Sequence, residues 1–268
     1  MDPHLVAVVV GILQGVFEWL PISSEGNVAI ALTALGERPD VAVSYALFLH
    51  LGTAVSATVY YREEVRTALA SWSDVRVGDA FDGETATLSF VVLATAAASA
   101  VGLVALAVLD AVVSELTGGA FVALVGALLV ATGLLQRFAG AYALATRSTP
   151  DAVDAVLVGG LQGLAILPGV SRSGTTTSAL LLRGHEGAAA FRLSFLLSIP
   201  AALIGGGVGV VRTGGVAVSP TAGLVALAVA AVVGYATIDL LMRVVRHVPV
   251  WILCVGLGGL AILGGLAV

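Results

Sequence analysis

The chain is dominated by long apolar runs separated by short polar segments. Apolar runs of roughly 18 to 24 residues recur from end to end, and each is long enough to cross about 30 Å of hydrocarbon as a helix. Six of these runs predict full membrane spans, at residues 41–61, 87–109, 118–136, 188–211, 221–242 and 249–268.

Two further apolar regions, residues 4–36 and 154–183, are interrupted near their middles. Pro21 to Gly26 interrupts the first region, and Pro168 to Gly174 interrupts the second. A proline denies the helix a backbone donor and the Gly-Ser cluster that follows favours a turn, so each region is expected to form a re-entrant hairpin of two short helices. Non-helical backbone deep in a membrane must be satisfied by protein or by a wet cavity, so we expect the two breaks to face each other in the interior. The alternative is a pair of kinked helices.

The two interrupted regions also resemble one another. Both contain Gln-Gly, then Leu-Pro, then Ser-x-x-Gly, beginning at Gln14, Leu20 and Ser23 in the first region and at Gln162, Leu167 and Ser171 in the second. This pattern predicts an internal repeat of a hairpin followed by three spans. The whole chain, residues 1–268, is then a single integral membrane domain, with repeat 1 at about residues 1–136 and repeat 2 at about residues 150–268.

The arginines predict the topology. If each hairpin returns to its own side, nine arginines fall on one face, namely Arg62, Arg66, Arg76, Arg137, Arg147, Arg183, Arg192, Arg243 and Arg246, and only Arg38 and Arg212 fall on the other. The positive-inside rule makes the first face cytoplasmic, which places both termini outside and makes the hairpins enter from opposite faces. The prediction is an all-α polytopic protein of the plasma membrane, built as an inverted repeat of about six transmembrane helices and two re-entrant hairpins. Such paired breaks are typical of a binding site near the midplane.

Composition supports the membrane assignment and excludes several other classes. Of the 268 residues 59% are hydrophobic and 11% are charged, and the mean hydropathy is +1.06. All twelve basic residues are arginine and the net charge is −5, which argues against nucleic acid as a partner and suits a halophilic, high-salt organism. Cys254 is the only cysteine, which excludes an internal disulfide and a multi-cysteine metal site. Gly-rich stretches permit close helix contacts, within one chain or in a homodimer.

Glu18 is a candidate functional residue because it lies in an apolar run. A carboxylate at that depth is costly unless it finds a cation, a metal ion or water. Gln14 lies one helical turn earlier, so the two polar groups share a face. A structural alternative is that Glu18 pairs with Arg172 only to hold the two hairpins together.

Arg172 is the only arginine within a predicted break, and hydroxyl residues surround it: Ser171, Ser173 and Thr175 to Thr177, with Gly174 among them. A guanidinium offers bidentate donors, hydroxyls offer more, and the N–H groups at the start of the following helix add a positive dipole end. This composition predicts a phosphate-like anion bound at a helix N-terminus.

Four ordered motifs carry a resemblance to a known family: Gln14 to Gly26, Leu49 to Thr53, Pro168 to Thr176 and Ser194 to Pro200. Over nearly the whole chain they resemble the undecaprenyl-diphosphate phosphatase family, also called the bacitracin-resistance protein family. The resemblance implies a membrane enzyme that hydrolyses a polyprenyl diphosphate to the monophosphate, which recycles a lipid carrier of envelope sugars.

The resemblance also implies roles for individual residues. Glu18 and Gln14 match the family's acidic motif, which is linked to catalysis and to a divalent cation, Mg²⁺ or Ca²⁺, with Glu18 as the expected metal ligand. Ser24 matches the proposed nucleophile. Arg172 matches the phosphate-binding arginine, with supporting hydroxyls from Ser171, Ser173 and Thr176. The remaining expected substrate contacts are Gln14, Ser23, His50 and Gly174.

One position departs from the family pattern. Asn27 stands where the family usually has its catalytic histidine, and an amide cannot take a proton near neutral pH. Asn27 is then expected only to hydrogen-bond the substrate, and either another base acts or hydrolysis has been lost. Glu25, Glu18 and, more weakly, His50 are the candidate bases. If hydrolysis has been lost, the protein is a non-hydrolytic transporter or flippase for a polyprenyl phosphate that uses the same Arg172 site.

Overall fold

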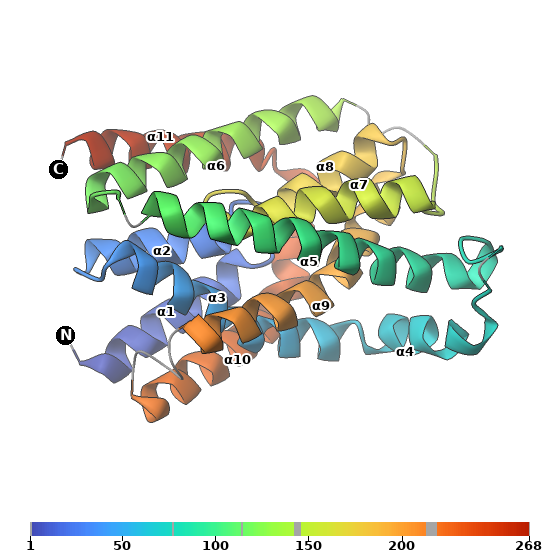
Figure 1. Cartoon of the computed structure of the whole chain (residues 1–268), viewed down its shortest axis with the longest axis horizontal. Coiled ribbons are helices and arrows are strands. Elements are labelled where there is room, and N and C mark those ends of the chain that lie inside the picture. The colour runs from blue at the N-terminus through green and yellow to red at the C-terminus, as the bar shows by residue number, and fades with distance from the viewer. Residues whose placement is uncertain (1, 77, 114, 142–145, 213–218, 268) are drawn as a thin grey trace.

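The computed structural model describes residues 2–76, 78–113, 115–141, 146–212 and 219–267, with the backbone alone at 245–247. Across these ranges the chain forms a bundle of helices with no β-strand, and a single isolated bridge joins Arg147 to His185. Most helices run along the long axis of the molecule (Figure 1).

Both halves of the chain use the same order of elements. The first half contains α1 (Pro3–Phe17), α2 (Ser24–Ala34), α3 (Pro39–Tyr60), α4 (Arg62–Ala70), α5 (Ala86–Val113) and α6 (Gly118–Gly140), with short 3-10 turns at Ser71–Asp74 and Gly83–Thr85. The second half contains α7 (Ala152–Gly163), a 3-10 turn at Leu164–Ile166, α8 (Arg172–Leu182), α9 (Gly187–Arg212), α10 (Pro220–His247) and α11 (Trp251–Leu266). Apart from α4, each half is a pair of short helices followed by three further helices.

Five helices in the described ranges are long and apolar enough to cross a membrane: α3, α5, α6, α9 and α10. The sixth predicted span, residues 249–268, is longer than the helix that forms there. Its helix α11 begins only at Trp251, after Pro249, and has 16 residues, fewer than the roughly 20 that a full span requires. The all-α, multi-pass prediction is confirmed, with α11 as a short apolar helix.

The two interrupted regions form re-entrant hairpins, as predicted. Helices α1 and α2 enter from one end of the bundle and α7 and α8 enter from the other, so the hairpins are inverted relative to each other (Figure 1). The kinked-helix alternative is wrong, because α2 runs back toward the end at which α1 begins. Helix α1 begins at the end of the bundle where α11 ends (Figure 1).

The two halves interleave. The most extensive pairings are α1 with α10, α3 with α9, α5 with α7 and α6 with α11, and each joins the first half to the second. Small residues allow this close approach: a Cβ at Gly15 would lie 2.8 Å from the Gly234 nitrogen, and one at Gly126 would lie 2.5 Å from the Gly258 oxygen. Helices from both halves therefore surround the centre of the bundle.

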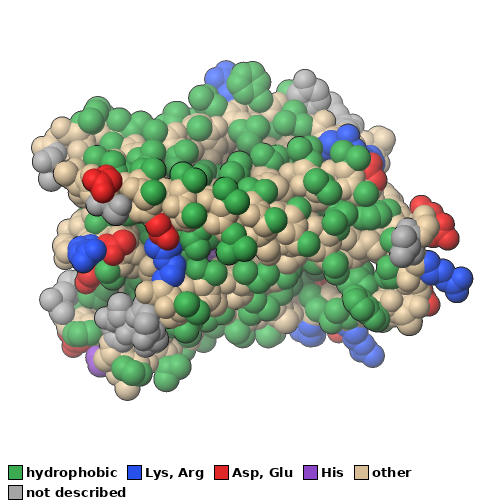
Figure 2. All heavy atoms as spheres, in the orientation of Figure 1, with side chains coloured by type: hydrophobic (Ala, Val, Ile, Leu, Met, Phe, Trp, Pro, Cys, Tyr) green, Lys and Arg blue, Asp and Glu red, His purple; other side chains and the backbone are tan. Residues whose placement is uncertain are grey.

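The surface suits a lipid bilayer around the middle of the bundle. Hydrophobic side chains cover the middle of the face in Figure 2, and most charged side chains lie toward the two ends. Leu103, Leu224 and Leu260 are each more than 60% exposed, which costs free energy in water and none in hydrocarbon. The protein is therefore a multi-pass membrane protein.

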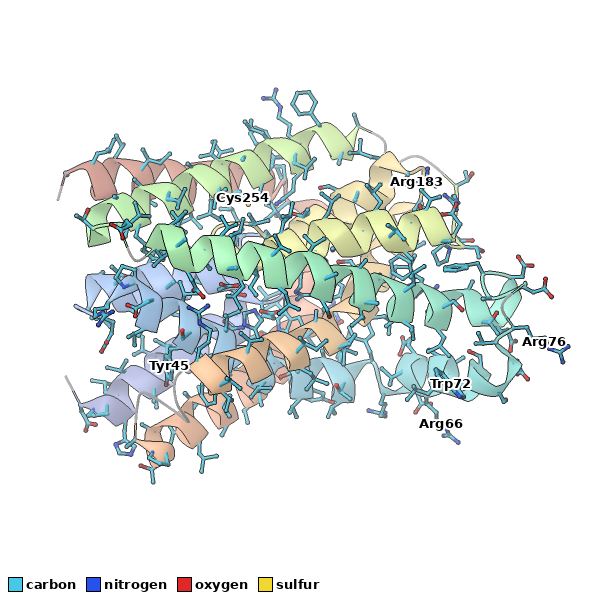
Figure 3. The ribbon with its side chains drawn as sticks, in the orientation of Figure 1. Tyr45, Arg66, Trp72, Arg76, Arg183 and Cys254 are labelled. Atoms are coloured by element: carbon cyan, nitrogen blue, oxygen red, sulfur yellow. The ribbon has the colours of Figure 1, made fainter. Side chains whose placement is uncertain are left out.

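Charge is distributed unequally between the two ends. Arg66, Arg76 and Arg183 lie at one end of the molecule (Figure 3), whereas Arg212 closes α9 at the other end and pairs with Asp110 at 2.5 Å. The side chain of Arg246, one of the nine arginines counted above, lies outside the described residues.

The entry of the second hairpin is fixed by a polar cluster. The carboxylate of Asp151 caps α7 by accepting the Asp154 N–H at 2.7 Å, and it accepts from Arg147 Nη2 at 2.6 Å. Asp154 is fully buried and accepts hydrogen bonds from Arg183 at 2.7 Å and from His185 at 2.9 Å. Burial acts to raise the pKa of Asp151, but the hydrogen bonds from Asp154 and Arg147 outweigh it and lower that pKa below its ordinary value.

Candidate active site

The two hairpin breaks meet at the centre of the bundle. The hydroxyl oxygen of Ser23 accepts the backbone N–H groups of Gly26 at 3.2 Å and of Gly169 at 3.1 Å. Arg172 Nη2 donates to Glu18 Oε1 at 2.5 Å, so a charged pair also joins the hairpins. The prediction that the breaks face each other is confirmed.

Side chains satisfy the non-helical backbone of the first break. The Pro21 carbonyl accepts hydrogen bonds from Gln136 Nε2 at 2.7 Å and from the Cys254 thiol at 3.0 Å. Ser23 itself adopts a left-handed conformation, with φ of 59°, which is uncommon for a residue that is not glycine. These side chains satisfy a backbone carbonyl of the non-helical segment that would otherwise need a hydrogen bond from water.

Asn27 contributes to the same support. Its Nδ2 donates to the Ile22 carbonyl at 2.7 Å and to the Ser23 carbonyl at 2.9 Å, so both amide hydrogens are used within the hairpin. Asn27 is not among the residues that line the polar pocket described below. Its predicted contact with substrate stays a prediction, and in this structure the side chain shapes the break.

Glu18 is the centre of the polar network, and it is only 4% exposed. Its Oε2 accepts hydrogen bonds from Ser24 Oγ at 2.7 Å and from Gln14 Nε2 at 2.9 Å, and His50 Nε2 lies 3.4 Å from the same oxygen. With Arg172 on Oε1, the carboxylate has the partners that a buried charge requires. The hydrogen bond from Ser24 also orients that hydroxyl toward a proton acceptor, the arrangement of an activated nucleophile.

The orientation of His50 follows from its backbone partner. His50 Nδ1 lies 2.9 Å from the Ala46 carbonyl, which can only accept, so Nδ1 carries a proton. The other ring nitrogen is therefore the atom that faces Glu18, and in the doubly protonated form it donates to that carboxylate. His50, the weakest of the three candidate bases predicted from the sequence, therefore lies at the site.

The predicted hydroxyls of the second break divide into two groups. Ser171 and Ser173 line the polar pocket, and Ser171 also caps α8 by accepting the Gly174 N–H at 3.2 Å. Thr176 lies one turn further along, where its hydroxyl is 2.6 Å from the Ser194 hydroxyl and joins α8 to α9. A Cβ at Gly174 would lie 2.5 Å from Gln136 Nε2, so this glycine allows close packing.

A small polar pocket, with about 270 Å³ of empty space including its open mouth, lies where the breaks meet. Its lining comprises Glu18, Leu20, Ser23, Ser24, Glu25, His50, Ala165, Val170, Ser171, Arg172 and Ser173. Helices α2 and α8 both begin at this pocket, with the N-cap residues Ser23 and Ser171 in its wall. Two helix N-termini and an arginine make the pocket suited to a phosphate group.

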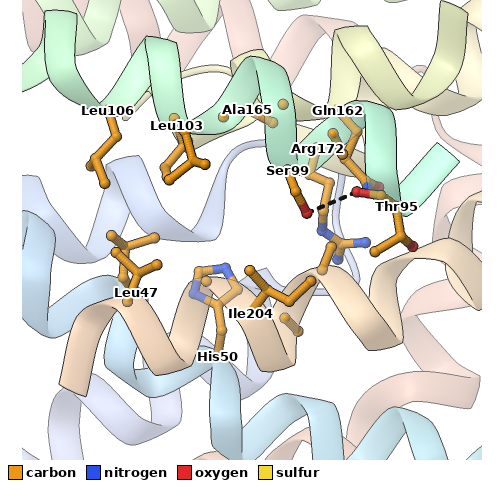
Figure 4. Close-up of a pocket in the computed structure, with 18 of the residues that line it drawn as sticks. Leu47, His50, Thr95, Ser99, Leu103, Leu106, Gln162, Ala165, Arg172 and Ile204 are labelled. Carbon is orange, nitrogen blue, oxygen red and sulfur yellow. Dashed lines mark hydrogen bonds between the residues drawn. The ribbon is translucent and has the colours of Figure 1, made fainter. Parts of the chain in front are cut away.

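A second cavity, an apolar groove with about 930 Å³ of empty space including its open mouth, continues from the polar pocket. Both cavities are lined by Glu25, His50, Ala165 and Arg172. Aliphatic side chains of α3, α5 and α9, among them Leu47, Leu103, Leu106 and Ile204, form much of the remaining wall (Figure 4). The two cavities together fit an amphipathic ligand with an anionic head and a long apolar chain.

The groove also contains polar residues that the sequence-based site did not include, namely Thr95 and Ser99 of α5 and Gln162 of α7. The internal repeat could have indicated one of them as a site residue, because Gln162 corresponds to Gln14. Nothing in the sequence indicated the two α5 residues, since that helix has no motif.

Several atoms at the site have no protein partner within the described part of the chain. These buried atoms include Glu25 Oε1 and Arg172 Nη1. No group of three or more His, Cys, Asp or Glu residues in the described ranges is placed to hold a metal ion by itself. A divalent cation here would need further oxygens, and phosphate oxygens are its usual supplement.

Fold and site together define a class: a multi-pass membrane protein in which two inverted re-entrant hairpins form an anion site beside an apolar groove. Residues 7–262 match the family model described as Bacitracin resistance protein BacA, and the chain belongs to this family.

The chain is 61% identical to the undecaprenyl-diphosphatase of Haloarcula marismortui, covering 100% of this chain and 99% of the relative. It is 41% identical to the undecaprenyl-diphosphatase of Methanococcoides burtonii, over 96% of each chain. It is 37% identical to that of Methanopyrus kandleri, over 97% of this chain and 96% of the relative. The resemblance seen in the motifs is confirmed, and the haloarchaeal relative agrees with the halophilic composition.

Proposed function

We propose that this protein hydrolyses undecaprenyl diphosphate, or a polyprenyl diphosphate close to it, to the monophosphate and inorganic phosphate. The observation that carries the proposal is the junction of the two cavities, where the Glu18, Ser24 and Arg172 pocket opens into the apolar groove. The head group occupies the pocket and the prenyl chain lies along the groove. The names of the relatives support the same activity.

Ser24 and Glu18 perform the chemical step in this proposal. As the Ser24 oxygen bonds to the terminal phosphorus, its proton passes to Glu18 Oε2, 2.7 Å away. The bridging P–O bond breaks, and the prenyl monophosphate leaves with the proton that Glu18 accepted. Water then attacks the phosphoserine ester and gives a proton to Glu18, which passes that proton to the Ser24 oxygen as the Ser24–phosphorus bond breaks and phosphate is released.

Arg172 and the helix N-termini stabilise the charge that develops on the phosphoryl oxygens. The guanidinium is held by Glu18, and the N–H groups at the starts of α2 and α8 are fixed by the fold. Because they are oriented before the substrate arrives, they reorganise little during the reaction. Glu18 takes the role that a histidine at the position of Asn27 would otherwise have.

We infer that Glu25, together with the substrate's phosphate oxygens, would hold the expected divalent cation, Mg²⁺ or Ca²⁺. Both oxygens of Glu18 already accept hydrogen bonds, whereas Glu25 Oε1 is buried without a protein partner. A bound cation would offset charge on the phosphate oxygens. Glu18, the metal ligand expected from the family motif, then acts as the proton acceptor.

We also propose that the protein lies in the plasma membrane, with its arginine-rich end in the cytoplasm as the positive-inside rule predicts. Both termini then lie outside. The homodimer that the Gly-rich stretches permit stays a prediction.

Phosphate release tests the proposal. The purified protein in detergent is mixed with undecaprenyl diphosphate, and inorganic phosphate is measured over a range of salt and Mg²⁺ or Ca²⁺ concentrations. We expect release from the wild type and a loss of about 100-fold or more in Arg172→Ala, because a buried charge contact to the phosphoryl group is removed. No release under any condition would overturn the proposal and favour a non-hydrolytic carrier of polyprenyl phosphate.

A further inference from the structure

Gln162 has an unused amide in the wall of the groove. The residue is 5% exposed, and neither its Oε1 nor its Nε2 has a hydrogen-bond partner in the described part of the chain. A buried primary amide without partners costs about 1–3 kcal/mol. Its side chain lies beside Arg172 in the groove (Figure 4), so a ligand there can supply the missing partners.

The repeat explains why this amide is free. In the first hairpin, Gln14 donates to Glu18 four residues later, at 2.9 Å. The residue four positions after Gln162 is Ile166, which offers no acceptor. Two equivalent glutamines therefore differ: the first is bound to a carboxylate and the second faces the cavity.

Two further donors line the same cavity without partners. Thr95 Oγ1 and Arg172 Nη1 are buried and unpaired in the described ranges. Helix α7 brings Gln162 close to Thr95 because it packs tightly on α5, where a Cβ at Gly163 would lie 2.6 Å from the Ala98 oxygen. An amide N–H₂, a hydroxyl and a guanidinium N–H together favour the oxygens of an anion.

Arg172 connects this cluster to the polar pocket. Its Nη2 donates to Glu18 in the pocket, while its Nη1 is unpaired and the residue lines both cavities. One guanidinium therefore lies between two places where a phosphoryl group can sit. A diphosphate has two such groups and a monophosphate has one.

We propose that Gln162, Thr95 and Nη1 of Arg172 form a second oxyanion subsite, which binds the second phosphoryl group of the diphosphate. Gln162 is then the residue that favours diphosphate over monophosphate ligands. This inference rests on the proposed function, because it assigns a polyprenyl diphosphate to the site. It adds a specificity residue on α7 that takes no part in the proton transfer.

Direct binding tests the subsite without catalysis. The probes are two prenyl ligands of equal chain length, a non-hydrolysable methylene diphosphonate and a monophosphonate, titrated into the purified full chain in detergent. In Gln162→Leu the Kd of the diphosphonate should rise about 10- to 100-fold, the range for a lost hydrogen bond to a charged group. The Kd of the monophosphonate should change less than about threefold, because its one phosphoryl group stays in the Glu18 pocket.

Two variants keep the test decisive. Gln162→Glu preserves the volume and adds a negative charge, so it should weaken the diphosphonate at least as much as Gln162→Leu does. Thr95→Val should weaken the diphosphonate selectively as well. Thr33→Val is the matched control, because Thr33 Oγ1 is also buried and unpaired but lines neither cavity.

The outcomes separate this inference from the proposed function. Equal losses for both ligands, or no loss for either in any of the Gln162 and Thr95 variants, would overturn the second subsite even if the wild type hydrolyses undecaprenyl diphosphate. Selective loss of the diphosphonate would support the subsite. That support would stand even if the wild type released no phosphate, in which case only the proposed hydrolysis would fail.

Discussion

Glu18→Gln is the most informative change at the site, because this one carboxylate accepts hydrogen bonds from the side chains of Gln14, Ser24 and Arg172. Oε1 accepts from Arg172, and Oε2 accepts from Ser24 and Gln14. A glutamine has one acceptor oxygen and one N–H₂ donor. If its oxygen stays on Arg172, the N–H₂ group faces the donor of Gln14, and if the amide flips, it faces the guanidinium instead.

The magnitude follows from these contacts. Either orientation removes the charge of a buried pair and leaves a donor unpaired, which costs about 3 kcal/mol of stability or more. The loss of a general base lowers the turnover rate by about 10²- to 10⁴-fold, equal to about 3–5 kcal/mol of activation free energy. We therefore expect a lower Tm together with a severe loss of kcat.

The assay combines thermal unfolding in detergent with phosphate release from undecaprenyl diphosphate. Glu37→Gln is the matched control, since Glu37 is exposed beyond the end of α2 and should change neither quantity. Turnover of Glu18→Gln within about threefold of the wild type would refute Glu18 as the proton acceptor, because general-base catalysis contributes far more than that. An unchanged Tm would refute the buried charged network.

The remaining predictions concern the nucleophile, the cation, the second break and the entry of α7. Ser24→Ala should lower kcat by about 10³-fold or more in the phosphate-release assay, because it removes the proposed nucleophile. Glu25→Gln should raise the Mg²⁺ or Ca²⁺ concentration needed for half-maximal activity about tenfold after metal removal with EDTA, since one charged oxygen ligand is lost. Gly169→Ala should cost about 2–4 kcal/mol in thermal unfolding, because Gly169 has φ of +100° and a Cβ there would overlap the Val125 carbonyl. The lowered pKa of Asp151 means that its carboxylate stabilises the fold above the ordinary value of 3.8, and this contribution disappears as the pH falls through the lower folded-state pKa. Thermal unfolding between pH 7 and pH 3 should therefore show a smaller acid-induced decrease in Tm for Asp151→Asn than for the wild type.

Each of these predictions has a clear contrary result. Normal turnover in Ser24→Ala would transfer the attack on phosphorus to water. An unchanged metal titration in Glu25→Gln would remove that residue from the cation site. Gly169→Ala with the Tm of the wild type would show that the second break tolerates a side chain, and parallel pH curves would remove Asp151 from the acid response.

The sequence by itself determined the class of the fold and the two charges at its centre. Apolar runs of membrane length must become helices, because only helices satisfy the backbone of a single segment in hydrocarbon. Pro21 and Pro168 mark the two breaks for the same reason, since a proline cannot donate to a helix. Glu18 and Arg172 could be found from their positions because a charge placed in an apolar run needs a partner.

The tertiary structure alone decided which polar side chains reach a ligand. Ser171 and Ser173 face the polar pocket, whereas Thr176 bonds to Ser194 and Asn27 supports its own hairpin. Neighbouring residues on one short helix point in different directions, so composition cannot separate them.

Gln162 and Thr95 show the same limit over a longer range. They line one cavity only because α5 and α7 pack through small residues, although 67 positions separate them in the chain. The apolar runs specify that these helices form, but not which faces they turn to each other. That choice depends on how all the helices pack at once, which is why the groove and its unpaired donors emerge only in three dimensions.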